Sequence, residues 1–190
     1  MRREVRTTYQ SFVRRPNAPG FLLGFAAGVF VWLLLTIGLA IQRPAGSDEF
    51  TSATVVRVID GDTIELDSGE RVRYIGLDTP ELFPRPECGA KAATDQNRSL
   101  VGGKRVDLLS GPEERDAYGR LLRYVFADGV FVNAQLVREG HARTSSFSRD
   151  ERFRQLFAQL GADAEKDGRG LWSTCELLKH RPYIPQGVHH

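Results

Sequence analysis

Cysteine, histidine and any surplus of positive charge are scarce in this chain of 190 residues. It contains two cysteines and four histidines, and its formal net charge is +2. Two cysteines cannot build a disulfide-framework protein, and the spacing of Cys88 and Cys175 fits no zinc-binding motif. Residues 51–190 hold 20 Lys and Arg against 21 Asp and Glu. Any attraction for nucleic acid must therefore come from local clusters of arginine rather than from the overall charge.

One long uncharged run lies near the N-terminus, at residues 21–41. As a helix it would be roughly 31 Å long, which is about the thickness of a bilayer core. The residues before it carry five arginines against one glutamate. The positive-inside rule then predicts a single-pass membrane protein with a cytoplasmic N-terminus and an extracytoplasmic remainder. A cleaved signal peptide is the alternative, but its apolar core is usually about 7–15 residues. The expected division is 1–20 as a basic cytoplasmic segment, 21–41 as a transmembrane anchor and 42–52 as a polar linker.

The most informative part of the chain is the stretch from Asp60 to Glu81. Two runs in it alternate like strands, Thr63–Leu66 and Val72–Leu77. Residues 67–70 between them are typical of a hairpin turn, because Asp and Gly accept the positive φ that such turns need. Antiparallel pairing would then bring the start of the first strand to the end of the second.

That pairing predicts a site with several carboxylates. Asp62, Asp78 and Glu81 are expected to gather at one edge of the hairpin. Three carboxylates at one place need a cation, and hard oxygen ligands on loops favour Ca²⁺. Arg73 on the adjoining strand supplies the positive charge that a phosphate group seeks. The pattern predicts a metal-plus-arginine site for a phosphodiester.

The rest of the chain predicts short strands mixed with helices. Strand-like runs cover Ala53–Ile59, Arg105–Leu109 and Leu121–Phe126, with a charged loop at residues 111–119. Helices are expected at Gly89–Val101, at Ala134–Glu139 with Asn133 as its N-cap, and at roughly Asp150–Lys166. The predicted fold class is α+β: a five-stranded β-barrel of the OB type with three helices, preceded by one N-terminal transmembrane helix.

Three segments resemble the staphylococcal, or thermonuclease-like, nuclease family. They are IDGDT (Ile59–Thr63), VRYIGLDTPE (Val72–Glu81) and DAYGRLLRYVFADG (Asp116–Gly129). The resemblance runs from about Ala53 to Trp172, and the motifs stand in the right order at suitable separations. It implies the OB-fold, a monomeric soluble thermonuclease-like domain at residues 53–175, and a C-terminal tail at 176–190. It also implies Ca²⁺-dependent hydrolysis of DNA and RNA that leaves 3′-phosphates.

The resemblance also implies roles for individual residues. Asp62 and Asp78 match residues that hold Ca²⁺ through their carboxylates, Thr79 matches one that offers a backbone carbonyl, and Asp60 matches an outer-shell residue. Arg73 and Arg120 match the two arginines that clamp the phosphate, where charge builds up in the transition state. Glu81 matches the proposed general base, and Tyr118 matches a residue that hydrogen-bonds a terminal phosphate.

Two features of the resemblance leave alternatives open. Alignment puts Ser146 where the family type member has a base-stacking aromatic residue, with only Phe147 nearby, so affinity or base preference is expected to differ. Cys88 and Cys175 fit a family variant with cysteines before the first helix and after the last. An extracytoplasmic domain favours a disulfide between them, and a reducing compartment favours two free thiols. A catalytically inactive OB-fold module that binds nucleic acid at a membrane remains the alternative function.

Overall fold

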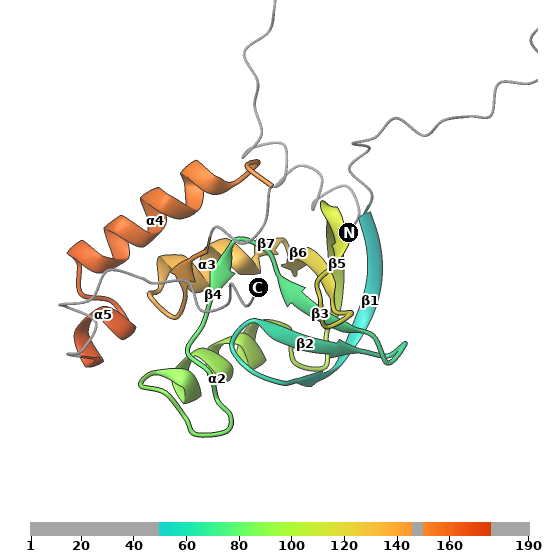
Figure 1. Ribbon diagram of the computed structural model, residues 1–190, viewed down its shortest axis with the longest axis horizontal. Helices are drawn as coiled ribbons and strands as arrows, with labels where there is room; N and C mark the ends of the chain where they lie inside the picture. Colours follow the sequence, from blue (N-terminus) through green and yellow to red (C-terminus); the bar gives the residue numbers. More distant parts are fainter. Residues whose placement is uncertain (1–49, 146–149, 176–190) are drawn as a thin grey trace, which may run out of the picture.

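The computed structural model describes residues 50–145 and 150–175 (Figure 1). The predicted anchor at 21–41 lies outside these ranges, as do Ser146, Phe147 and the tail from residue 176. No helix in the two described ranges is long and apolar enough to cross a membrane.

A closed barrel forms the centre of the molecule. Its strands are β1 (Phe50–Val58), β2 (Thr63–Leu66), β3 (Arg71–Tyr74), β5 (Arg105–Arg115) and β6 (Leu121–Ala127). They pair in the order β3-β2-β1-β5-β6, and a parallel pairing of β3 with β6 closes the ring. The short strand β7 (Val130–Phe131) extends β6 as a hairpin. The predicted five-stranded barrel is confirmed.

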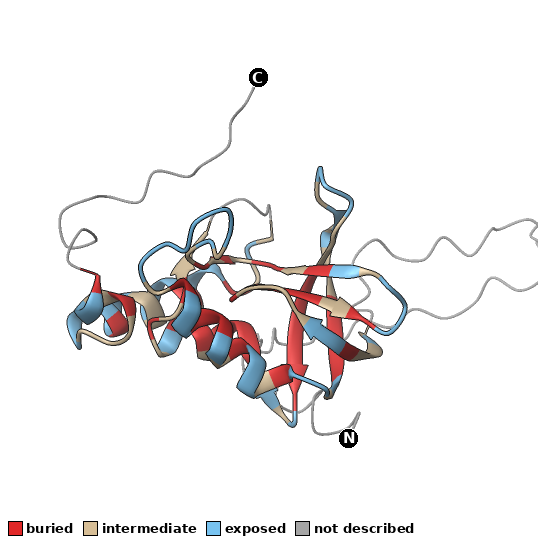
Figure 2. Ribbon diagram, turned by 90° about the horizontal axis from the view of Figure 1, so that it is seen from below, coloured by how far each residue is buried: buried red, intermediate tan, exposed pale blue. Residues whose placement is uncertain are grey.

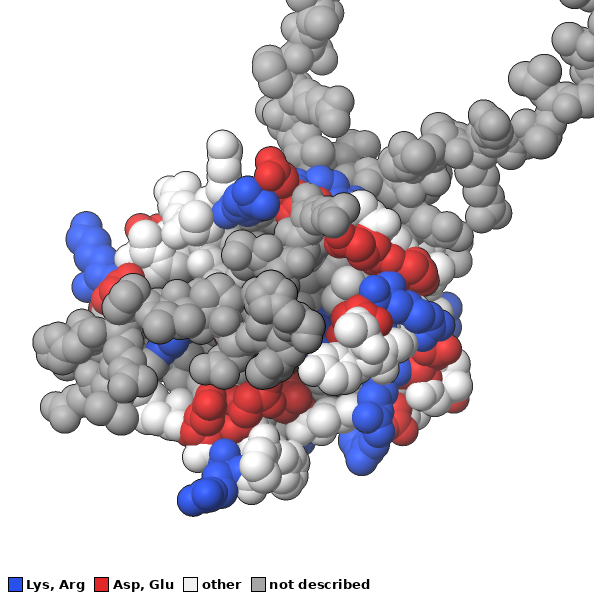
Figure 3. All heavy atoms as spheres, viewed as in Figure 1, with Lys and Arg blue, Asp and Glu red and all other residues white. Residues whose placement is uncertain are grey.

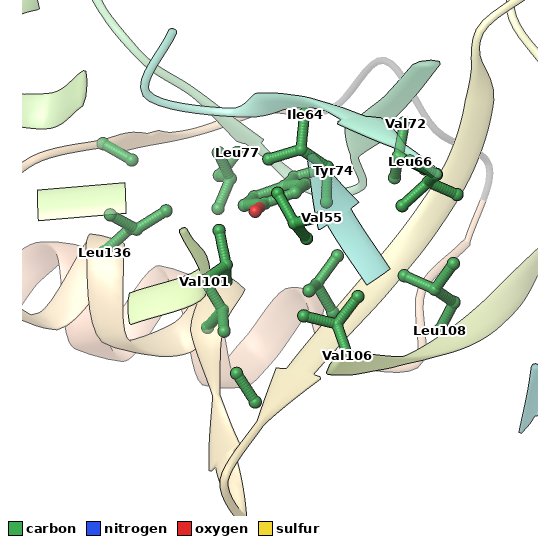
Figure 4. Close-up of a cluster of buried hydrophobic side chains, with 14 of the residues drawn as sticks. Val55, Ile64, Leu66, Val72, Tyr74, Leu77, Val101, Val106, Leu108 and Leu136 are labelled. Atoms are coloured by element: carbon green, nitrogen blue, oxygen red, sulfur yellow. The ribbon is translucent and has the colours of Figure 1, made fainter. Parts of the chain in front are cut away.

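Alternation along each strand separates the inside of the barrel from its outer face. Val55, Ile64, Val72, Tyr74 and Leu108 are all at most 2% exposed and share one core cluster (Figure 4). Their neighbours in the sequence point outward, as the period of two in a strand requires. Figure 2 shows buried residues concentrated along the strands and the central helix, with exposed residues at the turns.

Helices cover the barrel on two sides. They are α2 (Ala90–Val101), α3 (Val132–Arg138) and α4 (Arg154–Lys166), and a final turn, α5 (Leu171–Thr174), follows them. A second, aromatic cluster joins the outer face of β6 to α4, with Tyr124 against Phe153 at a ring-centroid distance of 4.7 Å. Phe157 of α4 belongs to the same cluster, so the stripe predicted for the last helix does face a core.

Several boundaries differ from the sequence prediction. Strand β5 continues to Arg115 through a register irregularity, so half of the predicted charged loop is strand. Helix α4 begins at Arg154 rather than near Asp150. Two short strands that were not predicted as a pair, β4 (Leu77–Asp78) and β8 (Arg143–Thr144), form a small second sheet.

The predicted capping role of Asn133 is wrong. Helix α3 begins at Val132, and its first residues have no side-chain cap. Asn133 is fully buried and joins β6 to the turn after β3 instead: its Oδ1 accepts the Val125 N–H at 2.9 Å, and its Nδ2 donates to the Ile75 carbonyl at 3.0 Å. An asparagine that can satisfy two buried backbone groups is more valuable there than at a solvent-exposed helix end.

Candidate active site

Asp62 lies at the centre of the candidate site, in the turn between β1 and β2. Its side chain is almost fully buried, and Oδ2 accepts hydrogen bonds from the Thr79 backbone N–H at 2.9 Å and the Thr79 hydroxyl at 3.0 Å. Gly61 permits this close approach, because a Cβ there would lie 2.7 Å from the Thr79 Oγ1 and 2.8 Å from the Ala93 Cβ. The turn at 60–62 and the segment at 78–79 are therefore held together by the Asp62 carboxylate.

Arg73 joins the two ends of this arrangement. It projects from the outer face of β3, with one guanidinium nitrogen 2.6 Å from Asp62 Oδ2 and another 2.6 Å from Asp78 Oδ1. It also donates to the Leu77 carbonyl at 3.1 Å. Its side chain is 14% exposed, and those of Asp62 and Asp78 are 6% and 33% exposed. A forked guanidinium between two carboxylates is a rigid and strongly charge-assisted arrangement.

Glu81 stands on an exposed loop just beyond Asp78. Its backbone N–H donates to the Glu87 carboxylate at 3.0 Å, and its carbonyl accepts the Glu87 N–H at 2.9 Å. These two bonds close the loop from 81 to 87, which contains a cis Phe83–Pro84 peptide bond and an exposed Phe83. The Glu81 carboxylate is exposed to solvent, and the charges of Asp62, Asp78, Arg73 and Glu87 act on it.

The site holds more negative than positive charge. Burial, and after it the nearby Asp62 carboxylate, raise the pKa of Asp60 to about 7. Burial also raises the pKa of Asp78, and burial together with Asp62 and Asp78 raises the pKa of Glu81. Burial alone would lower the pKa of Arg73, but Asp62 and Asp78 more than offset this and raise it. Four carboxylates share one guanidinium, so a further cation would relieve their repulsion.

The donor set fits a hard cation, although no complete metal cluster is preformed. Among the described residues, no group of three or more His, Cys, Asp or Glu side chains has metal-holding geometry. Arg73 occupies one oxygen each of Asp62 and Asp78. Carboxylate and carbonyl oxygens are still the ligands that Ca²⁺ prefers. The structure joins Asp62 to Thr79 by hydrogen bonds and to Asp78 through Arg73, and Asp60 Oδ1 accepts the Asp62 N–H at 3.0 Å.

Arg120 and Tyr118 stand on the hairpin between β5 and β6. The Arg120 Nε donates to Asp116 Oδ2 at 2.7 Å, and the guanidinium lies 5.4 Å from the centre of the Tyr118 ring. Tyr118 is 85% exposed. The parallel pairing sets Val72 opposite Leu121 and Arg73 opposite Leu122. Arg120 therefore points to the same outer face as Arg73, one strand away.

One positioning residue was missed by the sequence prediction. Asn97 on α2 is fully buried; its Nδ2 donates to the Asp60 carbonyl at 3.0 Å, and its Oδ1 accepts the Tyr74 hydroxyl at 2.9 Å. It ties the Asp60 turn to both the helix and the barrel core. A usable signal was present, because Ala93, Asn97 and Val101 recur every four residues on the apolar face of the helix.

The two cysteines form a disulfide in the structure, with a Cα–Cα distance of 5.9 Å. It links the start of α2 to the end of α5 across 87 residues. Leu171 packs directly over Gly89, where any Cβ would collide with it. The disulfide and this packing together hold the last helical turn against the loop that carries Glu81.

Comparison with known proteins places this geometry in a family. The sequence profile described as Staphylococcal nuclease homologue matches residues 71–174. The chain belongs to the staphylococcal nuclease family. It is accordingly a nuclease, an enzyme that hydrolyses phosphodiester bonds.

Relatives of this family member come from several bacteria. The chain is 34% identical to the thermonuclease of Staphylococcus intermedius over 161 residues, which cover 76% of this chain and 95% of the relative. It is 39% identical to an uncharacterized endonuclease of Escherichia coli O157:H7 over 137 residues, covering 67% and 84%. It is 32% identical to the endonuclease YhcR of Bacillus subtilis (strain 168) over 157 residues, which cover 74% of this chain but only 13% of that protein.

Proposed function

We propose that this family member is a Ca²⁺-dependent nuclease that cleaves both DNA and RNA and leaves 3′-phosphates. The observation that carries the proposal is the convergence of Asp62, Asp78 and Arg73 within hydrogen-bonding distance, beside Glu81. A site for a phosphodiester needs a positive charge for the phosphate and a base for the attacking water. This one has both, within reach of ligands for a hard cation.

The metal would be held by Asp62, Asp78 and the Thr79 carbonyl, with Asp60 in the outer shell. When bound, Ca²⁺ supplies Lewis-acid stabilisation of negative charge on the phosphate. Asp62 is fixed for this role by the two hydrogen bonds from Thr79, which leave little freedom for the carboxylate to rotate. Asp78 is held by β4, whose pairing with β8 sets Asp78 opposite Arg143.

The remaining residues would act on the substrate itself. Arg73 and Arg120 donate from the outer face of adjacent strands to the non-bridging phosphate oxygens, where charge grows in the transition state. Glu81, accessible and with a raised pKa, accepts the proton of the attacking water. Tyr118, exposed at the rim, donates its hydroxyl to a terminal phosphate.

Cleavage by the purified full chain tests the proposal. We expect degradation of single-stranded DNA and RNA with Ca²⁺ and none with a chelator. Asp62→Asn should abolish cleavage and weaken Ca²⁺ binding in calorimetry, because one anionic ligand is lost. Asp67→Asn, in the exposed turn between β2 and β3, is the matched control and should behave as wild type. Equal Ca²⁺ affinity in wild type and Asp62→Asn would place the ion elsewhere. Binding without cleavage would instead support the inactive OB-fold module.

We further propose that residues 21–41 anchor the protein in a membrane with the nuclease domain outside the cytoplasm. The length of the uncharged run and the arginines before it support this. A reporter fused after His190 should be active only outside the cytoplasm, and the full-length protein should fractionate with membranes. A soluble mature form that begins near Ala45 would show a cleaved leader instead.

A further inference from the structure

One arginine beside the active site has no assigned role. Arg71 is the first residue of β3 and is exposed. Within the described ranges, no hydrogen bond or ion pair involves its side chain. Its neighbours Arg57, Arg73, Arg115 and Arg120 each pair with a carboxylate. A cation without a partner, among cations that all have one, remains available for an external anion.

Strand register puts Arg71 on the same face as the phosphate-binding arginines. Val72 points into the core, so Arg71 and Arg73 both point outward. The parallel pairing of Val72 with Leu121, continued by one residue, sets Arg71 beside Arg120, which directly precedes β6. Adjacent strands lie about 4.8 Å apart, and alternate residues of one strand about 6.6 Å apart. Arg71, Arg73 and Arg120 therefore form a triangle of guanidinium-bearing positions on the outer face of the barrel.

The surroundings of Arg71 do not neutralise it. Its cross-strand partner on β2 is Glu65, but that carboxylate is already engaged by Arg57 on β1. Glu70, which precedes Arg71, bonds to Arg115 across the rim at 2.7 Å. Both of these acidic side chains are thus already paired, and Figure 3 shows acidic and basic side chains interspersed on the face in view. A local arginine triangle attracts a polyanion without any overall surplus of positive charge.

We infer that Arg71 binds the phosphate next to the scissile one along the substrate strand. The inference rests on the proposed function, because it assumes that Arg73 and Arg120 hold the scissile phosphate. The step from Arg73 to Arg71 is comparable with the separation of successive phosphates along an extended nucleic-acid strand. The contact is to the backbone, so it adds affinity for longer substrates without reading the bases. Arg71 is a binding residue outside the reaction centre, so its contact lowers KM and leaves kcat unchanged.

Cleavage of single-stranded oligonucleotides by the full chain tests this contact. Arg71→Gln should raise KM for a hexanucleotide about five- to tenfold with kcat unchanged, as loss of one charge-assisted contact would. The dependence of log kcat/KM on log salt should become shallower by about 0.7, the contribution of one phosphate on a single strand. Arg71→Lys should keep the wild-type salt dependence. Arg105→Gln is the matched control, since Arg105 is also exposed but pairs with Thr54 of β1, two residues before the pairing of Asp107 with Phe126 at the end of β6 far from Arg120.

Neutral substrates identify the phosphate. Replacing single phosphates on either side of the cleaved bond by methylphosphonates should weaken wild-type binding at one neighbouring position. At that position the replacement should have no further effect on Arg71→Gln. An active wild-type enzyme whose Arg71→Gln variant keeps its KM and salt dependence would overturn the inference while leaving the proposed function intact. A fall in kcat at unchanged KM would also overturn it, whereas a wild-type chain without metal-dependent cleavage would refute the proposed function itself.

Discussion

Replacement of Arg73 by glutamine is the perturbation that the site should feel most. The guanidinium is the only positive group within hydrogen-bonding distance of both Asp62 and Asp78 among the described residues. Glutamine keeps much of the side-chain length but removes the positive charge and the second terminal nitrogen, so it cannot bond both carboxylates as the guanidinium does. The variant therefore leaves a nearly buried carboxylate at Asp62 with only its Thr79 and Thr63 donors.

The cost should be large in the metal-free protein. Breaking a buried ion pair by removing one partner typically costs about 3–5 kcal/mol, because the remaining charge is left unpaired. The Asp62 side chain is 6% exposed, which places this pair in the buried class. A domain of this size is commonly stable by about 5–15 kcal/mol, so Arg73→Gln should remove a large share of that stability. At about 3–5 °C per kcal/mol, the melting temperature should fall by roughly 10–25 °C.

The loss should depend on pH and on calcium. Asp78 and Glu81 already have raised pKa values, and without Arg73, which lowers both, these values rise further. A carboxylate whose pKa is higher in the folded state than in the unfolded state destabilises the fold as pH rises through that interval. The difference between wild type and variant should therefore be greatest near pH 7.5 and smaller near pH 4.5. Excess Ca²⁺ should stabilise the variant more than wild type, because the ion replaces the missing cation.

Thermal unfolding followed by circular dichroism measures these differences at both pH values, with Ca²⁺ or chelator. Arg115→Gln is the matched control: Arg115 also pairs with a carboxylate at 2.7 Å, but the side chains of Arg115 and Glu70 are 44% and 40% exposed. Its removal should change the melting temperature little, as for most surface ion pairs. If Arg73→Gln and Arg115→Gln melt alike, or if the loss is the same at both pH values, the charge balance derived for this site is wrong.

Three further outcomes follow from the contacts. Arg120→Gln should lower kcat by two or more orders of magnitude, because one preorganised hydrogen-bond donor to the transition state is lost. The melting temperature should stay near that of wild type. Full activity of the variant would remove Arg120 from the mechanism. Reduction of Cys88–Cys175 should cost about 2–4 kcal/mol of stability, because it opens a long covalent loop, and hydrogen exchange should rise first in α5; equal melting curves with and without reductant would contradict this. In chelator, stability should decrease from about pH 4 to pH 7 as Asp60 ionises, and Asp60→Asn should flatten that slope, since its pKa is 3.8 when unfolded and about 7 when folded; an unchanged slope would assign the titration to another group.

The carboxylate end of the site could be anticipated because it is local in sequence. Asp62 and Asp78 are separated by one hairpin, and period-two alternation fixes which residues of β2 and β3 meet. The acidic residues then follow from their positions at the ends of these two strands. The barrel and its three main helices followed from the same periodicities, and the structure confirms them.

Other features depend on pairings that no local pattern encodes. The pairing of Asp78 with Arg143 joins residues far apart in the chain, and each strand involved is only two residues long. Asn133 was assigned to a helix cap because its sequence context suits one, yet tertiary contacts with Val125 and Ile75 determine its role. The ion pairs of Arg73 with both Asp62 and Asp78, each at 2.6 Å, could not be predicted either, because they depend on the side-chain conformations.

The parallel contact between β3 and β6 makes the arginine half of the site a product of barrel closure. Arg73 and Arg120 come from strands on the two sides of that seam, and only the pairing of Val72 with Leu121 puts them on a common face. The carboxylates, by contrast, are collected by the β2–β3 hairpin and by Thr79. Weakening the seam should therefore separate phosphate binding from metal binding, because the first depends on closure and the second on the hairpin.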